Sequence, residues 1–128
     1  MLNQFLREIR DVEIQKDPLR FRRNIERIGE VMAIEVSKTL DYQPTEVQTP
    51  LAKATVNTIS DQLVLATILR AGMPLHQGSL QIFDRAENAF LSAYRRENGE
   101  GELEIVAEYM AAPAIEGKTL IVVDPMLA

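Results

Sequence analysis

Two short runs of apolar residues have the pattern of buried strands. Leu63 to Leu69 reads LVLATIL, and Leu120 to Val123 is four consecutive apolar residues, most of them β-branched. Continuous runs of this length suit strands of a parallel sheet that are covered on both faces. Ala89 to Tyr94 has a similar composition. The pattern therefore predicts three core strands.

The segment from Pro18 to Leu40 has a helical period instead. Asp17 can cap the free N–H groups of a helix, and Pro18 suits its first position. Apolar side chains then recur at helical spacing, at Phe21, Ile25, Ile28, Met32 and Val36. We predict a helix over Pro18 to Leu40, preceded by an amphipathic segment, Met1 to Lys16, that packs on the body. A shorter helix is expected from Met73 to Phe83.

The opposite face of the long helix is rich in arginine. Arg20, Arg23 and Arg27 lie there at spacings that allow pairing with Glu26 and Glu30. A phosphate or nucleic-acid site is one interpretation, but a charge run of this kind is more often a solvated face. We predict a solvated face.

The remaining strand signals come in antiparallel pairs. Thr45 to Val47 and Ala52 to Thr58 read as short strands joined at Pro50, which suggests a hairpin or edge extension, or an interface. Asn98-Gly99 is a strong hairpin signal after the third core strand. The stretch from Leu103 to Tyr109 alternates apolar and acidic residues, as a half-exposed antiparallel strand does.

Composition narrows the class of protein. The chain has 128 residues, 46% of them hydrophobic, and a formal net charge of −5. That length suits one domain, and the acidic balance argues against a general nucleic-acid binder. The absence of cysteine excludes disulfides and thiol chemistry. No apolar run is long enough to span a membrane, and the N-terminus is too charged for a signal peptide. We expect a soluble cytoplasmic protein.

Charged residues stand directly after the predicted core strands. Arg70 and Arg95 follow two of them, and Asp124 follows a third. Arginine matches phosphate oxygens bidentately, and ligands of open α/β sheets bind at the carboxyl ends of the strands. The alternative is that both arginines pair with surface acids while Asp124 caps a following helix. His76, the only histidine, is expected to be a surface or helix-packing residue, and no protein-held metal site is predicted.

Three motifs resemble the uracil phosphoribosyltransferases, a family of type I phosphoribosyltransferases. They are ILRAG at residues 68–72, Tyr94-Arg95, and VDPMLA at residues 123–128. Their order and spacing agree with the family, and the region from Phe21 to Leu40 is similar to its N-terminal helix. The resemblance covers nearly the whole chain and is weakest from Asp41 to Ser60.

The resemblance implies an α/β fold with an N-terminal helix, a largely parallel core sheet and an antiparallel hairpin. It implies transfer of phosphoribose from phosphoribosyl diphosphate to uracil, giving UMP and diphosphate, with Mg²⁺ bound mainly through the substrate and a dimeric enzyme. Arg70 and Arg95 would contact the diphosphate. The first half of the loop that holds the ribose and its 5′-phosphate would be Asp124, Pro125, Met126, Leu127 and Ala128.

The sequence ends before the Thr-Gly-Gly-Ser segment with which the family continues this loop, and before its uracil-recognition segment. We therefore expect residues 1–128 to be the N-terminal portion of a single phosphoribosyltransferase domain, incomplete at the C-terminus and inactive alone. The alternative hypothesis is a regulatory module that keeps this fold to bind nucleotides or RNA.

Overall fold

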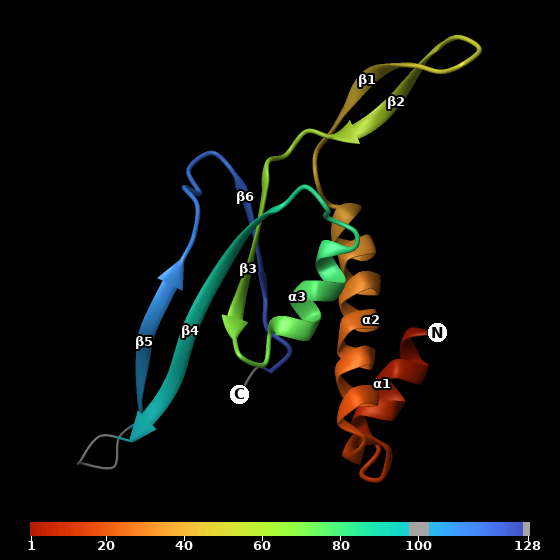
Figure 1. Cartoon of the computed structure of the whole chain (residues 1–128). Helices are drawn as coiled ribbons and strands as arrows, with labels where there is room; N and C mark the ends of the chain where they lie inside the picture. Colours follow the sequence, from red (N-terminus) through yellow and green to blue (C-terminus); the bar gives the residue numbers. More distant parts are fainter. Residues whose placement is uncertain (98–102, 127–128) are drawn as a thin grey trace.

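The computed structural model describes residues 1–97 and 103–126 (Figure 1). It contains helices, a small hairpin and a larger sheet. In chain order the elements are α1 (Leu2–Arg10), a short 3-10 helix (Ile14–Lys16), α2 (Pro18–Ser37), β1 (Tyr42–Gln48), β2 (Lys53–Ile59), β3 (Leu63–Leu69), α3 (Met73–Leu80), β4 (Glu87–Glu97), β5 (Leu103–Ala111) and β6 (Thr119–Val123).

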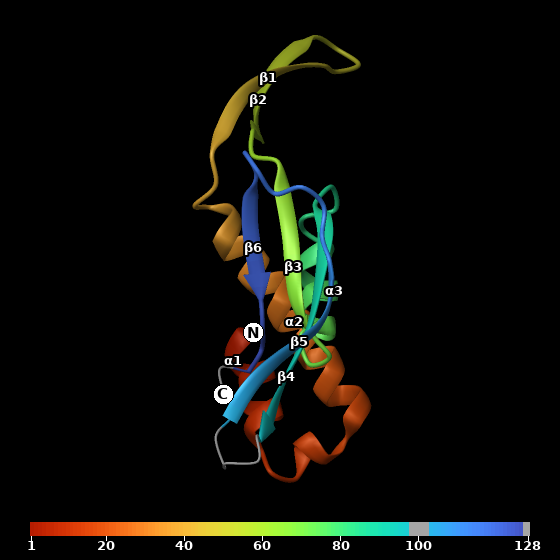
Figure 2. The ribbon, with the colours of Figure 1, turned by 90° about the vertical axis from the view of Figure 1, so that its left-hand side faces the viewer.

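The larger sheet has the strand order β5-β4-β3-β6. Its central strand, β3, runs parallel to both neighbours, with Leu69 opposite Ser92 of β4 and Thr67 opposite Val123 of β6. β5 pairs with β4 in the antiparallel direction. Helices α2 and α3 lie against one face of this sheet (Figures 1 and 2). The predicted fold class, α/β with a largely parallel sheet and an antiparallel hairpin, is confirmed.

The core lies between this sheet and the two helices. Leu65 and Val123 point from β3 and β6 toward Ile28 of α2 and Leu75 of α3, in one cluster of buried apolar side chains. Val64 points to the other face of β3 and is also fully buried. The apolar run of β3 therefore occupies a strand covered on both faces, as predicted.

The predicted N-terminal helix begins at Pro18, as expected, because Asp17 Oδ1 accepts the backbone N–H groups of Leu19 and Arg20, each at 3.0 Å. It ends at Ser37, three residues before the predicted boundary at Leu40. The backbone N–H groups of residues 38–40 bond to the carbonyls three residues earlier, which tightens the chain into a turn. Among the described residues, no helix is long and apolar enough to cross a membrane.

The segment before α2 packs on the body, as the sequence predicts. Four apolar side chains of α1 lie against the core cluster, namely Leu2, Phe5, Leu6 and Ile9. The guanidinium of Arg27 on α2 lies 5.3 Å from the centre of the Phe5 ring, within the range of a cation–π contact.

Helices α2 and α3 cross at two buried glycines. A Cβ atom on Gly78 would lie 1.9 Å from the carbonyl oxygen of Glu26, and one on Gly29 would lie 2.4 Å from that of Leu75. Both obstacles are backbone atoms, so no change of rotamer can relieve the clash. The crossing therefore requires glycine on each helix, and it holds α3 in close contact with α2.

β1 and β2 form the hairpin expected between Asp41 and Ser60. They pair from Tyr42 opposite Ile59 to Gln48 opposite Lys53, and the turn between them contains Pro50. Pro44 lies inside β1, which a two-stranded ribbon tolerates because one side of each strand is unpaired. The hairpin extends away from the larger sheet (Figure 1).

The predicted antiparallel strand from Leu103 to Tyr109 is present. Its alternating pattern does not give it one buried and one exposed face, however, which corrects the prediction that it is half-exposed. A register shift at Ser92 and Ala93 places Tyr109 opposite Ser92 and Ala107 opposite Ala93, so these two β5 residues point to opposite faces. Ile105 and Tyr109 are 74% and 59% exposed. The predicted Asn98-Gly99 turn lies outside the described residues.

His76 is a core residue and not a surface residue. Its side chain is 2% exposed, its Nε2 lies 2.7 Å from Asn88 Oδ1, and its ring contacts Phe90 at 5.2 Å between centroids. Burial lowers the pKa of His76 below its ordinary value, against a smaller raising effect of the Asn88 hydrogen bond. His76 therefore packs α3 against β4 as a neutral ring. Of the two roles that the sequence left open, surface residue or helix-packing residue, the structure supports the second.

Candidate anion-binding site

The parallel strands β3 and β6 end at the same edge of the sheet, and a charged residue follows each. Arg70 follows Leu69, and Asp124 follows Val123. The two loops lie close to the same end of the molecule in both ribbon views (Figures 1 and 2). The structure therefore brings these predicted positions to the carboxyl edge, where open α/β sheets bind ligands.

The loop after β3 is packed tightly against the end of β6. The Gly72 N–H donates to the Ile68 carbonyl at 3.0 Å, and the peptide bond between Leu69 and Arg70 is cis. The buried Thr67 hydroxyl donates to the Val123 carbonyl at 3.3 Å. A Cβ on Gly72 would lie 2.0 Å from Thr67 Oγ1. Thr67 and Gly72 therefore hold the Arg70 loop and the Asp124 segment in a fixed relation.

Asp124 begins a turn of its own. Its Oδ1 accepts the backbone N–H of Met126 at 3.1 Å, as short polar side chains do in turns. It is half-buried and lines a cavity of about 110 Å³ with residues of α2, α3 and β6. Arg70 lines a different cavity. The two predicted residues thus share an edge of the sheet but face separate spaces.

Arg95 lies within a strand and not after one. β4 continues to Glu97, past the predicted end at Tyr94, because it pairs with β5, and Arg95 is opposite Ile105. Ser92 is level with Leu69 of β3, so three further residues carry the backbone at Arg95 about 10 Å beyond that level. The Arg95 side chain, Leu127 and Ala128 lie outside the described part of the structure.

The Arg70 cavity has a volume of about 270 Å³ and is formed by three segments that are distant in sequence. They are the beginning of α2, the loop after β3 and the turn after β6. The residues that line it are Phe21, Arg22, Ile25, Arg70, Ala71, Pro74, Pro125 and Met126. Two arginines therefore border a cavity with two residues of the predicted ribose-phosphate loop, and none of the described residues that line it is an acid. The exposed wall is almost wholly apolar, so the charged groups of the two arginines contribute little to it.

Arg22 borders this cavity, which the sequence did not reveal. The helix was expected to present its arginines to solvent, and Arg23 does so in a 2.7 Å ion pair with Glu26. Arg22, which was not among the arginines predicted on that face, is also exposed, but it lies next to Phe21 and three residues before the buried Ile25, at the border of the apolar face. The spacing of three residues between Arg22 and an apolar residue of the predicted buried face is the sequence signal that places Arg22 at this border.

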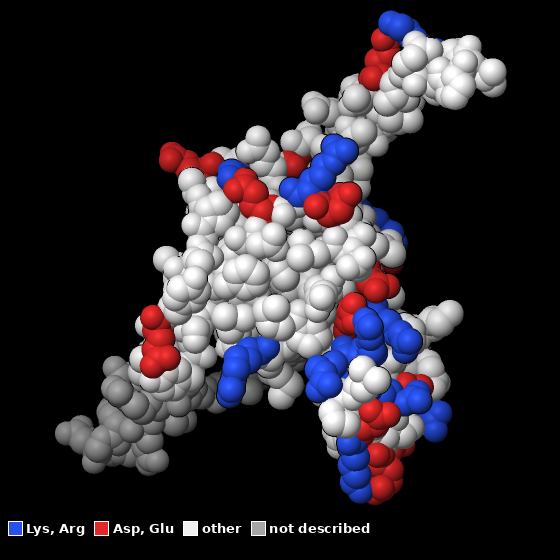
Figure 3. Space-filling model, in the orientation of Figure 1, with Lys and Arg blue, Asp and Glu red and all other residues white. Residues whose placement is uncertain are grey.

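Two exposed arginines without an acid partner among the described residues lie beside this cavity. Neither Arg22 nor Arg70 forms a hydrogen bond or ion pair with an acid among residues 1–97 and 103–126. Figure 3 shows Lys and Arg side chains, with some acids among them, over the beginning of α2, and a further basic group over the end of β3. Arginine is charged at physiological pH and binds phosphates through a planar fork. The exposed arginines at this edge of the sheet, rather than the apolar wall of the cavity, thus suit a phosphorylated ligand.

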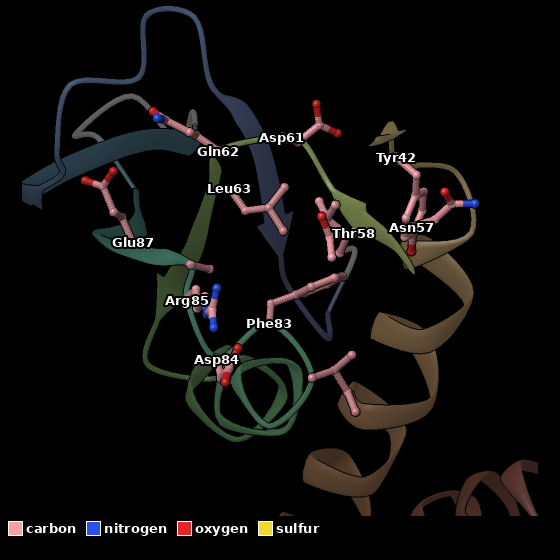
Figure 4. Close-up of a pocket in the computed structure, with 13 residues that line it drawn as sticks. Tyr42, Asn57, Thr58, Asp61, Gln62, Leu63, Phe83, Asp84, Arg85 and Glu87 are labelled. Carbon is pink, nitrogen blue, oxygen red and sulfur yellow. The ribbon is translucent and has the colours of Figure 1, made fainter. Parts of the chain in front are cut away.

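A larger cavity, of about 610 Å³, lies at the opposite end of the sheet (Figure 4). It is bordered by the base of the hairpin and by the connection from α3 to β4. Its charged lining residues are Asp61, Asp84, Glu87 and Arg85. Acids outnumber the one arginine, so this cavity is poorly suited to phosphate. The carboxyl-edge cavity remains the candidate site.

The fold defines a class: an α/β protein with a largely parallel sheet, whose candidate anion-binding site lies at the carboxyl edge of that sheet. Comparison with known proteins gives the family. The family model for uracil phosphoribosyltransferase matches residues 1–128. The chain therefore belongs to the uracil phosphoribosyltransferase family.

Individual relatives agree with this assignment. A protein of Porphyromonas gingivalis named uracil phosphoribosyltransferase is 56% identical over 128 residues, which is 100% of this chain and 59% of the relative. A protein of the same name from Methanothermobacter thermautotrophicus is 38% identical over 114 residues, covering 88% of this chain and 52% of the relative.

Solved structures show the same fold. The structure of the AQ2163 protein from Aquifex aeolicus matches with a TM-score of 0.79 and 27% identity, over 99% of this chain and 57% of that chain. The present chain therefore spans little more than half the length of the proteins it matches.

Proposed function

We propose that this chain supplies the N-terminal portion of one uracil phosphoribosyltransferase domain. In the reaction a ring nitrogen of uracil loses its proton and forms a bond to C1′ of phosphoribosyl diphosphate, and the bond from C1′ to the diphosphate oxygen breaks. The products are UMP and diphosphate, and the proton passes to the diphosphate or to water. The carrying observation is the cavity in which Arg70 meets Pro125 and Met126 at the carboxyl edge of the sheet. The regulatory nucleotide- or RNA-binding alternative is not favoured, because the matching relatives carry the name of the enzyme.

Arg70 is assigned to the diphosphate. The leaving group gains negative charge as its bond to C1′ breaks, so a fixed guanidinium stabilises the transition state more than the ground state. The bonds of Gly72 and Thr67 hold the loop in place before substrate binds. Arg95, on the extension of β4 beyond the sheet edge, is assigned to the same group because the antiparallel pair could close over the substrate.

Asp124 to Ala128 are assigned to the ribose and its 5′-phosphate, and Asp124 also fits the implied Mg²⁺. One Asp124 oxygen already accepts the Met126 N–H. Among the described residues no group of three or more acidic or histidine side chains could hold a metal ion. A lone carboxylate suits Mg²⁺ that keeps its waters and binds mainly through substrate phosphates. When bound, the ion would neutralise charge on the diphosphate.

Self-association is part of the proposal. The β1–β2 hairpin extends from the body, and two-stranded hairpins are marginally stable in water unless another surface covers them (Figure 1). Its charges, Glu46 and Lys53, pair with each other, which leaves a nearly neutral surface suited to a second copy of the chain. Light scattering after size exclusion is expected to give the mass of a dimer, and a monomer at micromolar concentration would contradict this. A cytoplasmic location fits charged, phosphorylated substrates.

The test of the proposal extends this chain to the full length of its relatives. Residues 1–128 are joined to the part of the P. gingivalis protein that follows the aligned region, and the chimera is incubated with uracil, phosphoribosyl diphosphate and Mg²⁺. UMP is measured by chromatography, with the P. gingivalis protein as the positive control and the 128-residue chain alone as the expected inactive form. A chimera that folds but makes no UMP, beside an active control, would refute the proposal.

A further inference from the structure

We infer that His76 is a positioning residue for the Arg70 loop, the segment from Arg70 to Gly72. The inference rests on the proposed function, in which Arg70 contacts the diphosphate, and it adds a residue that does not itself touch substrate. His76 lies in the first turn of α3, directly after this loop, and its backbone N–H donates to the Gly72 carbonyl at 2.9 Å. The Gly72 N–H donates in turn to the Ile68 carbonyl at 3.0 Å. Two backbone hydrogen bonds therefore connect His76 to the end of β3, with Arg70 between them.

The beginning of α3 lacks the usual means of fixing a helix terminus. Its N-cap is Gly72, so no N-cap side chain accepts the free N–H groups of the first turn. The helix has only 8 residues, too few to be stable through its own hydrogen bonds. Contacts with other elements therefore decide where the first turn lies. Leu75 packs this turn into the core beside α2, and His76 packs it against β4.

His76 attaches this turn to the strand residues that support the loop. Its Nε2 lies 2.7 Å from Asn88 Oδ1, and its ring lies 5.2 Å from that of Phe90, between centroids. Phe90 is opposite Thr67 of β3 in the sheet. Thr67 Oγ1 occupies the space beside Gly72 that a Cβ atom there would need. The His76 side chain and the Gly72 backbone are therefore held at the same level of the sheet.

Packing alone does not explain a histidine at this position. The side chain is 2% exposed, and its Nδ1 is buried without a hydrogen-bond partner within residues 1–97 and 103–126. A buried acceptor without a donor costs free energy that an apolar side chain would not cost. With Asn88 Oδ1 as the acceptor, Nε2 carries the proton, and the hydrogen bond fixes the direction of the ring. The ring therefore fixes the rotation of α3, and with it the path of the loop that joins α3 to β3.

The test compares His76→Leu with His76→Gln in the chimera. Leucine keeps an apolar side chain but removes the hydrogen bond, whereas glutamine keeps an N–H donor near the position of Nε2. His76→Leu is expected to raise the KM for phosphoribosyl diphosphate about fivefold and to weaken calorimetric binding of inorganic diphosphate by the same factor, the usual effect of one hydrogen bond. The KM for uracil stays unchanged. His76→Gln should retain most of the parent's affinity for diphosphate.

Phe83→Leu is the matched control. Phe83 is a buried residue just beyond the other end of α3, and it lines the cavity at the opposite end of the sheet. Its replacement loses core packing far from the Arg70 loop. If His76 only stabilised the fold, both leucine variants would lower kcat, because less of the enzyme would be folded, and both would leave the KM values unchanged. That result would overturn the inference.

A double-mutant cycle shows whether His76 acts through Arg70. In the Arg70→Gln chimera, His76→Leu is expected to cause no further loss of kcat/KM for phosphoribosyl diphosphate. An equal loss in the presence and absence of Arg70 would contradict the inference and leave the proposed function in place. Absence of UMP formation by a folded parent chimera would instead refute the proposed function.

Amide hydrogen exchange of the 128-residue chain tests the anchoring without substrate. His76→Leu is expected to speed exchange of the Gly72 N–H about fivefold, because the loop opens more often. The Ile82 N–H, which bonds to the Ser79 carbonyl beyond the other end of α3, should exchange at an unchanged rate. Equal exchange at Gly72 in the parent and the variant would refute the positioning role, whether or not the chimera is active.

Discussion

Replacing Arg70 with Gln is expected to lower kcat/KM for phosphoribosyl diphosphate in the chimera by about 100-fold, the effect typical of losing one donor aimed at charge that develops in a transition state. Arg70 leaves the end of β3 in a loop held by the Gly72 N–H and packed on Thr67. It is exposed and has no acid partner among the described residues. Its removal should therefore affect the reaction and not the fold.

Steady-state kinetics with varied phosphoribosyl diphosphate measure this effect, and circular dichroism checks the fold. Arg85→Gln is the matched control, because Arg85 is an exposed arginine beside the cavity at the opposite end of the sheet. It should leave kcat/KM within about twofold of the parent. Equal kinetics for the Arg70 and Arg85 variants would show that Arg70 is an ordinary surface residue, which was the alternative to a diphosphate role.

Replacing Gly78 with Ala is expected to lower the free energy of unfolding by about 3 kcal/mol, at the upper end of the usual cost of overpacking. The added Cβ would meet the Glu26 carbonyl at 1.9 Å. Because the obstacle is helix backbone, α3 must move away from α2. Alanine is otherwise the better helix former, so the higher intrinsic propensity would offset only about 1 kcal/mol of the loss.

Urea denaturation of the 128-residue chain, followed by circular dichroism, measures the change. Gln77→Ala serves as the control, since Gln77 is the exposed neighbour of Gly78 on the same helix. It should shift the unfolding free energy by less than about 0.5 kcal/mol. Equal or greater stability of Gly78→Ala would mean that the two helices do not cross at this distance.

The elements with strong local signals could be predicted from sequence. LVLATIL forms β3 with the predicted bounds, because a strand covered on both faces needs an unbroken apolar run. The beginning of α2 is set by Asp17 and Pro18, whose chemistry is local. The same holds for the carboxyl-edge positions of Arg70 and Asp124, which follow from the parallel order of the strands.

Features that depend on tertiary contacts could not be predicted. The bulge opposite Ser92 changes the face of the sheet to which the following β5 residues point. No residue type in the strand indicates that a bulge will form there. His76 is buried only because α3 packs on Asn88 and Phe90. Arg22 borders the carboxyl-edge cavity only because the loops after β3 and β6 come to the beginning of α2. Sequence periodicity describes one helix or strand at a time, and it does not show which segments come into contact in the folded chain.

The most direct test of the central claim is the stoichiometry of the reaction catalysed by the chimera. The account predicts that one UMP and one diphosphate form for each uracil consumed, and that no diphosphate is released when uracil is omitted. Both products are quantified in the same samples over time, beside the P. gingivalis protein. Diphosphate release without UMP, or no product from a folded chimera, would contradict the claim that these residues form half of a phosphoribosyl transfer site.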